Sequence, residues 1–341
     1  MKRKMSLNLK LNQDYKTAAD FFQAHDDLLL LVHEKPDGDA LGSVLAAAHL
    51  LQKLGKTVTL VNDDPIPDKF MFLPLADRFQ LPEQVAGKFD RVISFDCGDR
   101  KRLGRSASLI AESAHLLNVD HHVTNDKFGT ENLVDLEAAA TCQIVFKIAY
   151  QLQMEIDLDT ATCLYTGLMT DTGGFRYSNT SEEVLLIAAN LLTKGVSPYK
   201  IVDRVMETIS WPQLLLIRAA LDTLGRDDSG QIAWVTITRQ MVDTAGGCDE
   251  DVEGLVNYPR NVEGVEVGIS FRESSPGRIK VSFRSKYVVD VGAIALEFGG
   301  GGHARAAGCT LEGELSAVQE KVLARVGEAV RSNTAHLEEK E

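Results

Sequence analysis

Residues 33–43 read HEKPDGDALGS, and they lie between an apolar run over 28–32 and a helical pattern over 40–54. A predicted buried strand therefore ends at a histidine and at two aspartates, Asp37 and Asp39, before a helix begins. Carboxylates that crowd together repel one another, and each loses hydration free energy when it is buried. Either water solvates these side chains or a cation binds among them.

The length and composition of the chain favour a two-domain globular protein. Its 341 residues are many for a single hydrophobic core, and its hydrophobic share of 44% and charged share of 25% are ordinary. No apolar run approaches the ~20 residues that span a bilayer, so we expect no membrane partner.

The N-terminus and the cysteines indicate a cytoplasmic location. The first residues, MKRKMSLNLKLNQD, are basic but contain no apolar signal core. The five cysteines are scattered, odd in number, and form no CxxC pair, which fits reduced thiols.

The net charge of −13 argues against binding of long nucleic acid, because proteins that do so usually present a basic surface to the phosphates. The segment 258–310 has a positive net charge, since it contains seven Lys or Arg and only five Asp or Glu. The chain is therefore expected to exclude long duplexes and to bind a short anionic substrate at a local site.

The first half of the chain alternates between strand and helix patterns. The candidate strands are 27–32, 57–61, 91–95 and 114–119. Such alternation predicts an α/β domain with a parallel sheet and helices on both faces.

The second half changes character twice. Helical spacing dominates 137–224, in the segments 137–154, 159–170, 181–194, 198–207 and 211–224. After the polar break at 225–230, the strand patterns QIAWVTI, VEVGISFRE and GRIKVSFRS follow, and a last helix is predicted over 313–332. We predict a catalytic domain over 1–195, a helical connector over 196–225 and a smaller α/β domain over 226–335, with an active-site cleft between the two domains.

Polar side chains follow three of the predicted strands at the points where the strands end. The first strand leads to His33, Asp37 and Asp39, the third leads to Asp96, and the fourth leads to the Asp120, His121, His122 triplet. Ligands of open parallel sheets bind at the carboxyl ends of the strands, so these clusters are expected on one functional edge.

A fourth acidic residue, Asp171, ends a predicted helix just before two glycines. The helix dipole disfavours a buried acid at that end, and a nearby cation would offset the effect. Each motif alone is typical of a solvated turn or a helix cap. Four of them at strand and helix ends favour a metal site.

The candidate ligands are rich in oxygen, include imidazole and lack thiolate, a set that suits Mn²⁺ or Mg²⁺ better than structural zinc. They are His33, Asp37, Asp39, Asp96, His121 and Asp171. Six residues are too many for one ion that keeps an open position. They suit two ions about 3.5–4 Å apart that share a bridging carboxylate and clamp a phosphoryl group.

The chain resembles the DHH phosphoesterases. The matching segments are PDGDALGS at 36–43, Asp96 with RLG at 102–104, Asp120 to His122, DTGGF at 171–175 and GGGGHARAAG at 299–308. The last segment is similar to the signature of the domain that is commonly paired with DHH. Chain length and this domain make the protein similar to the nanoRNase and pAp-phosphatase branch, where pAp is 3′-phosphoadenosine 5′-phosphate.

The resemblance implies a role for each candidate residue. One Mn²⁺ is expected at His33, Asp37 and Asp96, and a second at Asp39, Asp96, His121 and Asp171, with Mg²⁺ or Co²⁺ as substitutes. His122 is expected to face the scissile phosphate, and Asp120 to orient a neighbouring group. Cys97, directly after Asp96, departs from the small or hydroxyl residue expected there, and we interpret it as a small buried residue.

The C-terminal glycine-rich segment is the candidate substrate seat. Gly301 and Gly302 let the backbone approach an anion, and His303 can donate to a phosphate oxygen. Arg284 and Ser285, at the end of a predicted strand, are the other candidate contacts, because a planar guanidinium suits phosphate. The alternatives are a flexible loop and a solvated edge-strand arginine.

The resemblance implies hydrolysis of very short oligoribonucleotides, with pAp as a further substrate, to mononucleotides by in-line attack of a metal-activated hydroxide. His122 or a metal-bound water would protonate the leaving oxygen. The alternatives are a cyclic or linear dinucleotide phosphodiesterase acting on pApA, pGpG or cyclic di-AMP, an inorganic pyrophosphatase, and a nucleotide sensor without activity. The glycine-rich domain argues against the pyrophosphatase, and the complete ligand set argues against the sensor. A homodimer is expected from the resemblance alone.

Overall fold

The computed structural model describes residues 9–338, so the basic residues 1–8 of the predicted N-terminus lie outside the described part. The chain divides between Thr208 and Ile209 into two compact units, called here the first and the second unit. This division falls inside the segment 196–225 that the sequence assigns to a helical connector.

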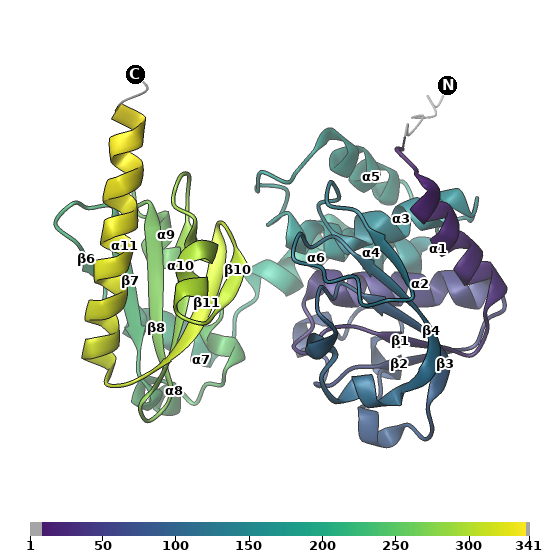
Figure 1. The fold of residues 1–341 in the computed structure, drawn as a ribbon, viewed down its shortest axis with the longest axis horizontal. Helices are drawn as coiled ribbons and strands as arrows, with labels where there is room; N and C mark the ends of the chain where they lie inside the picture. Colours follow the sequence, from purple (N-terminus) through teal and green to yellow (C-terminus); the bar gives the residue numbers. More distant parts are fainter. Residues whose placement is uncertain (1–8, 339–341) are drawn as a thin grey trace. The chain divides into compact units, whose positions relative to one another are not determined.

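A five-stranded sheet, entirely parallel, forms the centre of the first unit in the order β2-β1-β3-β4-β5 (Figure 1). Its strands are β1 (Leu28–Leu31), β2 (Val58–Val61), β3 (Phe89–Phe95), β4 (Ile110–Asp120) and β5 (Glu131–Val134). The four predicted strands are present, whereas β5 was not predicted.

Strand β1, between β2 and β3, is buried on both faces, as its unbroken run of leucines predicts. Leu28 and Leu30 pack into the larger core cluster beneath the helices, while Leu29 and Leu31 pack into a smaller cluster on the other face. Cys97 lies fully buried in that smaller cluster, which confirms its interpretation as a small buried residue.

Five helices pack on the first of these faces, and a long 3₁₀ segment, η4 (Arg100–Leu109), packs on the other. The helices are α1 (Gln13–Ala24), α2 (Gly38–Lys53), α3 (Thr141–Gln151), α4 (Leu158–Asp171) and α5 (Glu182–Leu192). Short 3₁₀ turns join β2 to β3, and they are η1 (Asp68–Phe70), η2 (Ala76–Arg78) and η3 (Pro82–Gln84). The unit ends with α6 (Pro198–Val202) and a π-helical turn, η5 (Asp203–Glu207).

The helix predicted over 137–154 begins later than expected, at Thr141. The reason is a contact between segments far apart in sequence. Both carboxylate oxygens of Asp39 accept hydrogen bonds from the first backbone amides of α3, those of Thr141 and Cys142, at 2.5 and 2.9 Å. The spacing of apolar residues within 137–154 cannot reveal where α3 begins, because the side chain that caps this helix belongs to another segment of the chain.

The strand order places β1 beside β3, and the chain leaves these two strands in opposite directions along the sheet, toward β2 and β4. A crevice for ligands forms where the order of such a sheet reverses. His33 follows β1 and Asp96 follows β3, so the two side chains flank that switch point.

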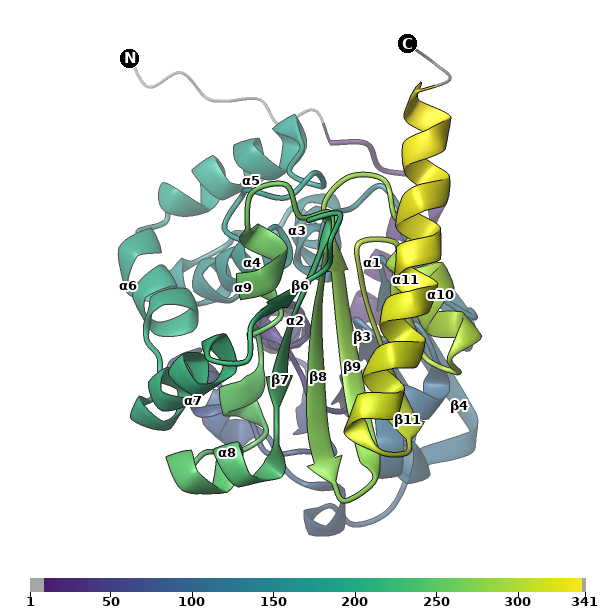
Figure 2. The ribbon, with the colours of Figure 1, turned by 90° about the vertical axis from the view of Figure 1, so that its left-hand side faces the viewer.

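The second unit has a mixed six-stranded sheet in the order β10-β11-β9-β8-β7-β6, in which only β7 and β8 pair in parallel (Figure 2). Its strands are β6 (Gly225–Arg226), β7 (Ile232–Ile237), β8 (Val267–Ser275), β9 (Arg278–Ser285), β10 (Gly301–His303) and β11 (Ala306–Glu312). The segment SSPG between the two predicted strand patterns joins β8 to β9 in an antiparallel hairpin.

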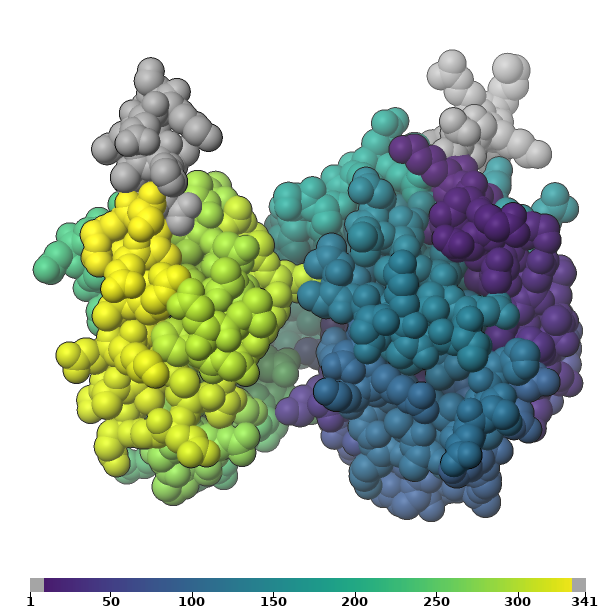
Figure 3. Space-filling model, in the orientation of Figure 1, coloured from purple at the N-terminus to yellow at the C-terminus, as the bar shows by residue number. Residues whose placement is uncertain are grey.

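Helices cover both faces of this second sheet. One face packs against α10 (Val291–Glu297) and α11 (Leu315–Glu338), and α11 forms much of the surface of this unit in the view of Figure 3. Over β7, the other face packs against α7 (Trp211–Leu221) and α8 (Arg239–Ala245), with η6 (Glu250–Val252) and α9 (Asn257–Asn261) alongside. The predicted α/β class, with a parallel first sheet and a smaller second domain, is confirmed.

None of the helices within residues 9–338 combines the length and the apolar character that crossing a membrane requires.

Helices α2 and α4 approach closely, and Gly42 makes this approach possible. A Cβ atom at Gly42 would lie 2.5 Å from the carbonyl oxygen of Cys163 and 2.9 Å from Sγ of Cys142. We expect Gly42→Ala to lower the free energy of unfolding by about 1–3 kcal/mol, because the backbone of α4 must shift. Urea denaturation followed by circular dichroism measures the change.

Gly327→Ala in α11 is the matched control. Its added Cβ would meet only the guanidinium end of Arg331, at 3.2 Å, which can rotate away. Alanine is the better helix former, so this variant should keep or raise the stability, by up to about 1 kcal/mol. Equal destabilisation by both substitutions would show that the contact between α2 and α4 is not tight.

Candidate metal centre

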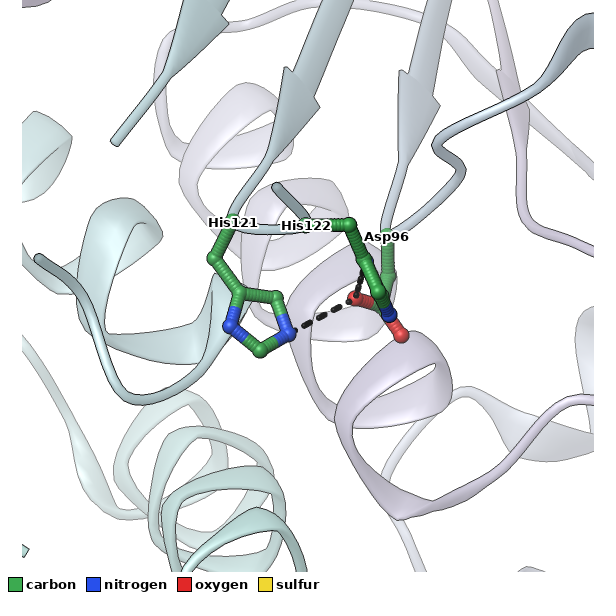
Figure 4. Close-up of side chains that lie close together, drawn as sticks. All are labelled: Asp96, His121 and His122. Carbon is green, nitrogen blue, oxygen red and sulfur yellow. Dashed lines mark ion pairs between the residues drawn. The ribbon is translucent and has the colours of Figure 1, made fainter. Parts of the chain in front are cut away.

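The predicted site residues of the first unit gather at the carboxyl edge of its sheet. His33 follows β1, Asp96 follows β3, and His121 and His122 follow β4. Figure 4 shows Asp96 beside the two adjacent histidines, with an ion pair to each of them. The fourth segment, at the end of α4, adds Asp171, whose Oδ2 lies 3.2 Å from Nε2 of His121.

Asp37 and Asp39 owe their different surroundings to the start of α2. Asp37 is the N-cap of the helix, and its Oδ1 accepts hydrogen bonds from the backbone amides of Asp39 and Ala40. The second carboxylate oxygen of the exposed Asp37 can therefore face a metal ion. Asp39 lies inside the first turn, where it is 0% exposed.

Asp96 is central because its two oxygens face two different groups. Oδ2 lies 3.6 Å from Nε2 of His33, and Oδ1 lies 3.5 Å from Nε2 of His121. Thr141 donates its hydroxyl to Oδ1 at 2.9 Å. The backbone of Asp96 is left-handed, with φ of 53°, a conformation that a non-glycine residue adopts at a cost and often at a functional site.

The donor atoms form two sets that share Asp96. His33, Asp37 and Asp96 can surround one ion, while Asp39, His121 and Asp171 form a second set, which Oδ1 of Asp96 adjoins. The structure thus brings together all six ligands that the sequence predicts.

Hydrogen bonds orient His33 and His121 in the same way. Nδ1 of His33 lies 2.7 Å from the carbonyl oxygen of Glu34, and Nδ1 of His121 lies 3.3 Å from that of Ala138. A carbonyl oxygen can only accept, so Nδ1 carries the proton and Nε2 faces the carboxylates. Histidine ligands of metals characteristically have this arrangement.

His122 is oriented differently, although it is the next residue. Its Nδ1 lies 2.8 Å from Oδ1 of the buried Asp120, so the ring is anchored by a carboxylate instead of a carbonyl group. The nitrogen of His122 that lies 3.7 Å from Oδ1 of Asp96 is also Nδ1, the nitrogen that binds Asp120. Asp96, His121 and His122 also lie close enough together to form a third candidate set. The hydrogen bond from Nδ1 to Asp120 nevertheless distinguishes the ring of His122 from the rings of His33 and His121, and the orienting role of Asp120 stays a prediction.

The electrostatics of the site reflect carboxylates that have been removed from water. Burial raises the pKa of Asp39, and the neighbouring charge of Asp96 raises it further. Burial likewise raises the pKa of Asp171, to about 6. Burial lowers the pKa of His121, but Asp171, Asp96 and Asp39 outweigh it and raise that pKa to about 10. These carboxylates require positive charge beside them.

Divalent cations fit this requirement and these distances. Ligands bonded at about 2.1 Å and at right angles lie about 3 Å apart, and the candidate pairs lie 3.2–3.9 Å apart. Oxygen and imidazole donors suit Mn²⁺ or Mg²⁺. The residues present fit two ions, with Asp96 between them.

The predicted substrate residues lie together in the second unit, at the ends of β9 and β10. Arg284 pairs across strands with Ala306, which in turn pairs with His303. Gly302 has φ of 138°, and a Cβ atom there would meet the carbonyl oxygen of Ala306 at 2.6 Å, so only glycine fits.

Ser285, the remaining predicted contact, is buried at 1% exposure, and its hydroxyl donates to the carbonyl oxygen of Ala304. Its backbone amide also donates to the carbonyl oxygen of Arg305. In the structure Ser285 therefore fixes the segment that follows His303. Gly301, next to this segment, has open space where a side chain would be.

The sequence interpretation missed the residues that hold the ligands in place. Thr141 binds both Asp39 and Asp96, Asn125 binds Asp120, and Asn179 donates to the carbonyl oxygen of Asp171. The position of Asn125, three residues after His122, was a usable signal. Thr141 and Asn179 lie in segments whose patterns gave no sign of a contact with the site.

Comparison with protein families gives two matches. The model of the DHH family, N-terminal domain, matches residues 27–168, and that of the DHHA1 domain matches residues 236–332. The chain is 35% identical over 303 residues to the bifunctional oligoribonuclease and PAP phosphatase NrnA of Thermus thermophilus, which covers 88% of this chain and 89% of that protein.

Two other matches extend over a similar length. A probable bifunctional oligoribonuclease and PAP phosphatase NrnA of Streptococcus mutans is 27% identical, over 86% of this chain and 92% of that protein. Among solved structures, an exopolyphosphatase-related protein from Bacteroides fragilis superposes with a TM-score of 0.87 at 27% identity, over 93% of this chain and 97% of that one.

The shared position of Asp96 leads to a prediction about metal binding. Asp96→Asn removes one charge from both donor sets, so both Mn²⁺ sites should weaken together. Asparagine tolerates the left-handed backbone at this position, so the fold should remain intact. Calorimetric titration with Mn²⁺ measures the affinities.

Asp99→Asn is the control, because Asp99 lies in the same loop but only caps the backbone amide of Lys101. Its metal affinities should equal those of the wild type. Two sites of unchanged affinity in Asp96→Asn would exclude a shared ligand.

The contrast between the adjacent histidines leads to a second prediction. His121→Ala removes a candidate ligand and should weaken Mn²⁺ binding by about 100-fold or more, since even the loss of a group that only orients a ligand costs 10–100-fold. His122→Ala should leave the metal content unchanged, as measured by elemental analysis of the purified proteins. Equal metal loss in the two variants would contradict the separate orientations of the rings.

Proposed function

Because this chain belongs to the DHH family, we propose that it is a metal-dependent phosphoesterase that hydrolyses very short single-stranded RNA to mononucleotides, with pAp as a further substrate. Relatives that match most of the chain carry the names of oligoribonuclease and PAP phosphatase. The observation on which the proposal depends is the position of Asp96, whose two oxygens face the two donor sets.

Two divalent cations, Mn²⁺ in the first place, would bind at these sets, lower the pKa of a water molecule and neutralise charge on the phosphate. His33, Asp37 and Asp96 would hold one ion, and Asp39, His121 and Asp171 would hold the other beside Asp96. Thr141 and the start of α3 keep Asp39 and Asp96 in place before substrate arrives.

His122 is the group left to act on the substrate. Its Nδ1 is held by Asp120, and we assign to Nε2, the other ring nitrogen, the donation to a phosphate or a leaving oxygen. The proximity of Asp120 and Asp96 favours the protonated ring, against the effect of burial, so that the pKa of His122 is raised. A positively charged ring suits a group that transfers a proton to the leaving oxygen.

The second unit would supply the substrate contacts. Arg284 and His303 lie on adjoining strands around small residues, and they offer a guanidinium and an imidazole to a terminal phosphate. The free thiols of all five cysteines fit the reducing cytoplasm, which we propose as the compartment.

This arrangement predicts a preference for short substrates. RNA of two to five nucleotides should be cleaved faster per mole than a 20-mer, because the net charge of −13 repels the additional phosphates. Arg284→Ala should lower kcat/KM for dinucleotides by roughly 10- to 150-fold, which corresponds to a charge-assisted hydrogen bond of about 1.5–3 kcal/mol. Steady-state kinetics on oligonucleotides of graded length, with Mn²⁺, measure both effects.

Arg278→Ala is the matched control, since Arg278 is an exposed arginine at the far end of the same strand. It should cleave dinucleotides like the wild type, and both variants should retain their metals. Equal rates on dimers and 20-mers, with Arg284→Ala unaffected, would overturn the proposed substrate seat. Faster turnover of cyclic di-AMP or pyrophosphate than of dinucleotides and pAp would favour the alternative activities.

A further inference from the structure

Asn125 lies in the loop that follows β4, outside the six candidate ligands, and its side chain contacts the group that holds His122. Nδ2 of Asn125 lies 2.6 Å from Oδ2 of Asp120 and 2.8 Å from Oδ1 of Asn118. The other oxygen of Asp120 holds Nδ1 of His122 at 2.8 Å.

The carboxylate of Asp120 needs this second donor. Asp120 is 0% exposed, and a buried carboxylate without hydrogen bonds on both oxygens pays a large desolvation cost. His122 satisfies Oδ1 and Asn125 satisfies Oδ2, so the plane of the carboxylate is fixed from both sides. A carboxylate fixed in this way restricts the orientation of the imidazole ring that it binds.

The contacts continue beyond Asp120 to the turn that carries Asp96. Asn118 donates through Nδ2 to the carbonyl oxygen of Cys97 at 3.1 Å, and Asn125 approaches the same oxygen at 3.4 Å. Cys97 directly follows Asp96, whose backbone is left-handed. The two asparagines therefore connect the loop of His122 with the turn of the shared candidate ligand.

We infer that Asn125 is a positioning residue that acts through Asp120 to aim Nε2 of His122 at the oxygen leaving the phosphorus. The inference deepens the proposed function and rests on it. In the hydrolytic step the oxygen of the attacking water forms a bond to phosphorus and a water proton is released to solvent, while the bond from phosphorus to the leaving oxygen breaks and the proton on Nε2 passes to that oxygen. The ring becomes neutral, keeps its Nδ1–H bond to Asp120, and regains a proton from solvent.

A second contact of Asn125 offers a competing explanation. Its Oδ1 accepts a hydrogen bond from the backbone amide of Lys127 at 2.7 Å, which stabilises the turn after the triplet. If this turn were the whole role, loss of Asn125 would disturb every substrate equally. A role through His122 affects only substrates whose leaving oxygen needs a proton.

The test compares two substrates in the full-length protein with Mn²⁺. The first is the dinucleotide pApA, whose leaving oxygen is a poor leaving group without a proton. The second is the p-nitrophenyl ester of thymidine 5′-phosphate, whose leaving group departs as a stabilised anion. Asn125→Ala should lower kcat on pApA by about 10–100-fold, because a misplaced proton donor loses part of the 10²–10⁴-fold that general acid catalysis contributes, and leave kcat on the nitrophenyl ester within about twofold.

A double-mutant cycle with His122→Ala gives the second readout. Because Asn125 acts through His122, adding Asn125→Ala to His122→Ala should cost nothing further on either substrate. Metal content should equal that of the wild type throughout. Asp126→Ala is the control, since Asp126 is an exposed neighbour in the same loop, and it should behave like the wild type.

Equal losses on the two substrates in Asn125→Ala, or independent losses that multiply in the double variant, would overturn the inference. Loss of bound metal in Asn125→Ala would overturn it as well, because the residue would then support the ions instead of His122. A wild-type protein that cleaves neither pApA nor pAp would instead refute the proposed function. The two failures are thus distinguishable.

Discussion

The structure of the first unit depends on two carboxylates, those of Asp39 and Asp96, that are removed from water at the edge of a parallel sheet. Neither is left without partners. Asp39 accepts the first two amides of α3, and Asp96 accepts the hydroxyl of Thr141 while facing two histidines. Hydrogen bonds and partial charges reduce the cost of burying these groups, but only a positive charge between them removes it. Without metal, His121 supplies part of this charge, because Asp171, Asp96 and Asp39 raise its pKa to about 10. Divalent cations at the donor sets would take over this role.

Much of this could be predicted from the chain alone, because strand ends and acidic motifs coincide in the sequence. The unbroken apolar run before His33 gives a buried strand, and in a parallel sheet its end must lie on the same edge as the end of the strand before Asp96. The order of the strands, the additional strand β5 and the late start of α3 at Thr141 could not be predicted. These features depend on contacts between distant segments, such as the capping of α3 by Asp39, which local spacing does not encode.

The two adjacent histidines show how local geometry separates roles that the sequence cannot. Neighbouring residues at the end of a strand point in different directions, so His121 and His122 meet different partners. A carbonyl oxygen beside Nδ1 of His121 directs its Nε2 to the carboxylates, whereas a carboxylate beside Nδ1 of His122 stabilises a charged ring. One triplet of residues can therefore provide both a metal ligand and a proton donor, since each ring is fixed by the type of acceptor behind it.

The proposed function requires the acidic chain to attract an anion, and the second sheet has features that suit this task. Side chains of β9 alternate, so that Ile279, Val281 and Phe283 enter the core while Lys280, Ser282 and Arg284 share the opposite face. The cross-strand partners of Arg284 are Gly268 and Ala306, and that of Ser282 on β11 is Gly308. Gly308 and Gly300 line a pocket beside Lys280 and Ser282, where a phosphate can approach without displacing the sheet, whereas the backbone of Arg260 packs against Gly268. Positive charge is concentrated on one face of β9, whereas the chain as a whole is negatively charged. This combination favours a substrate with few phosphates over a long polymer.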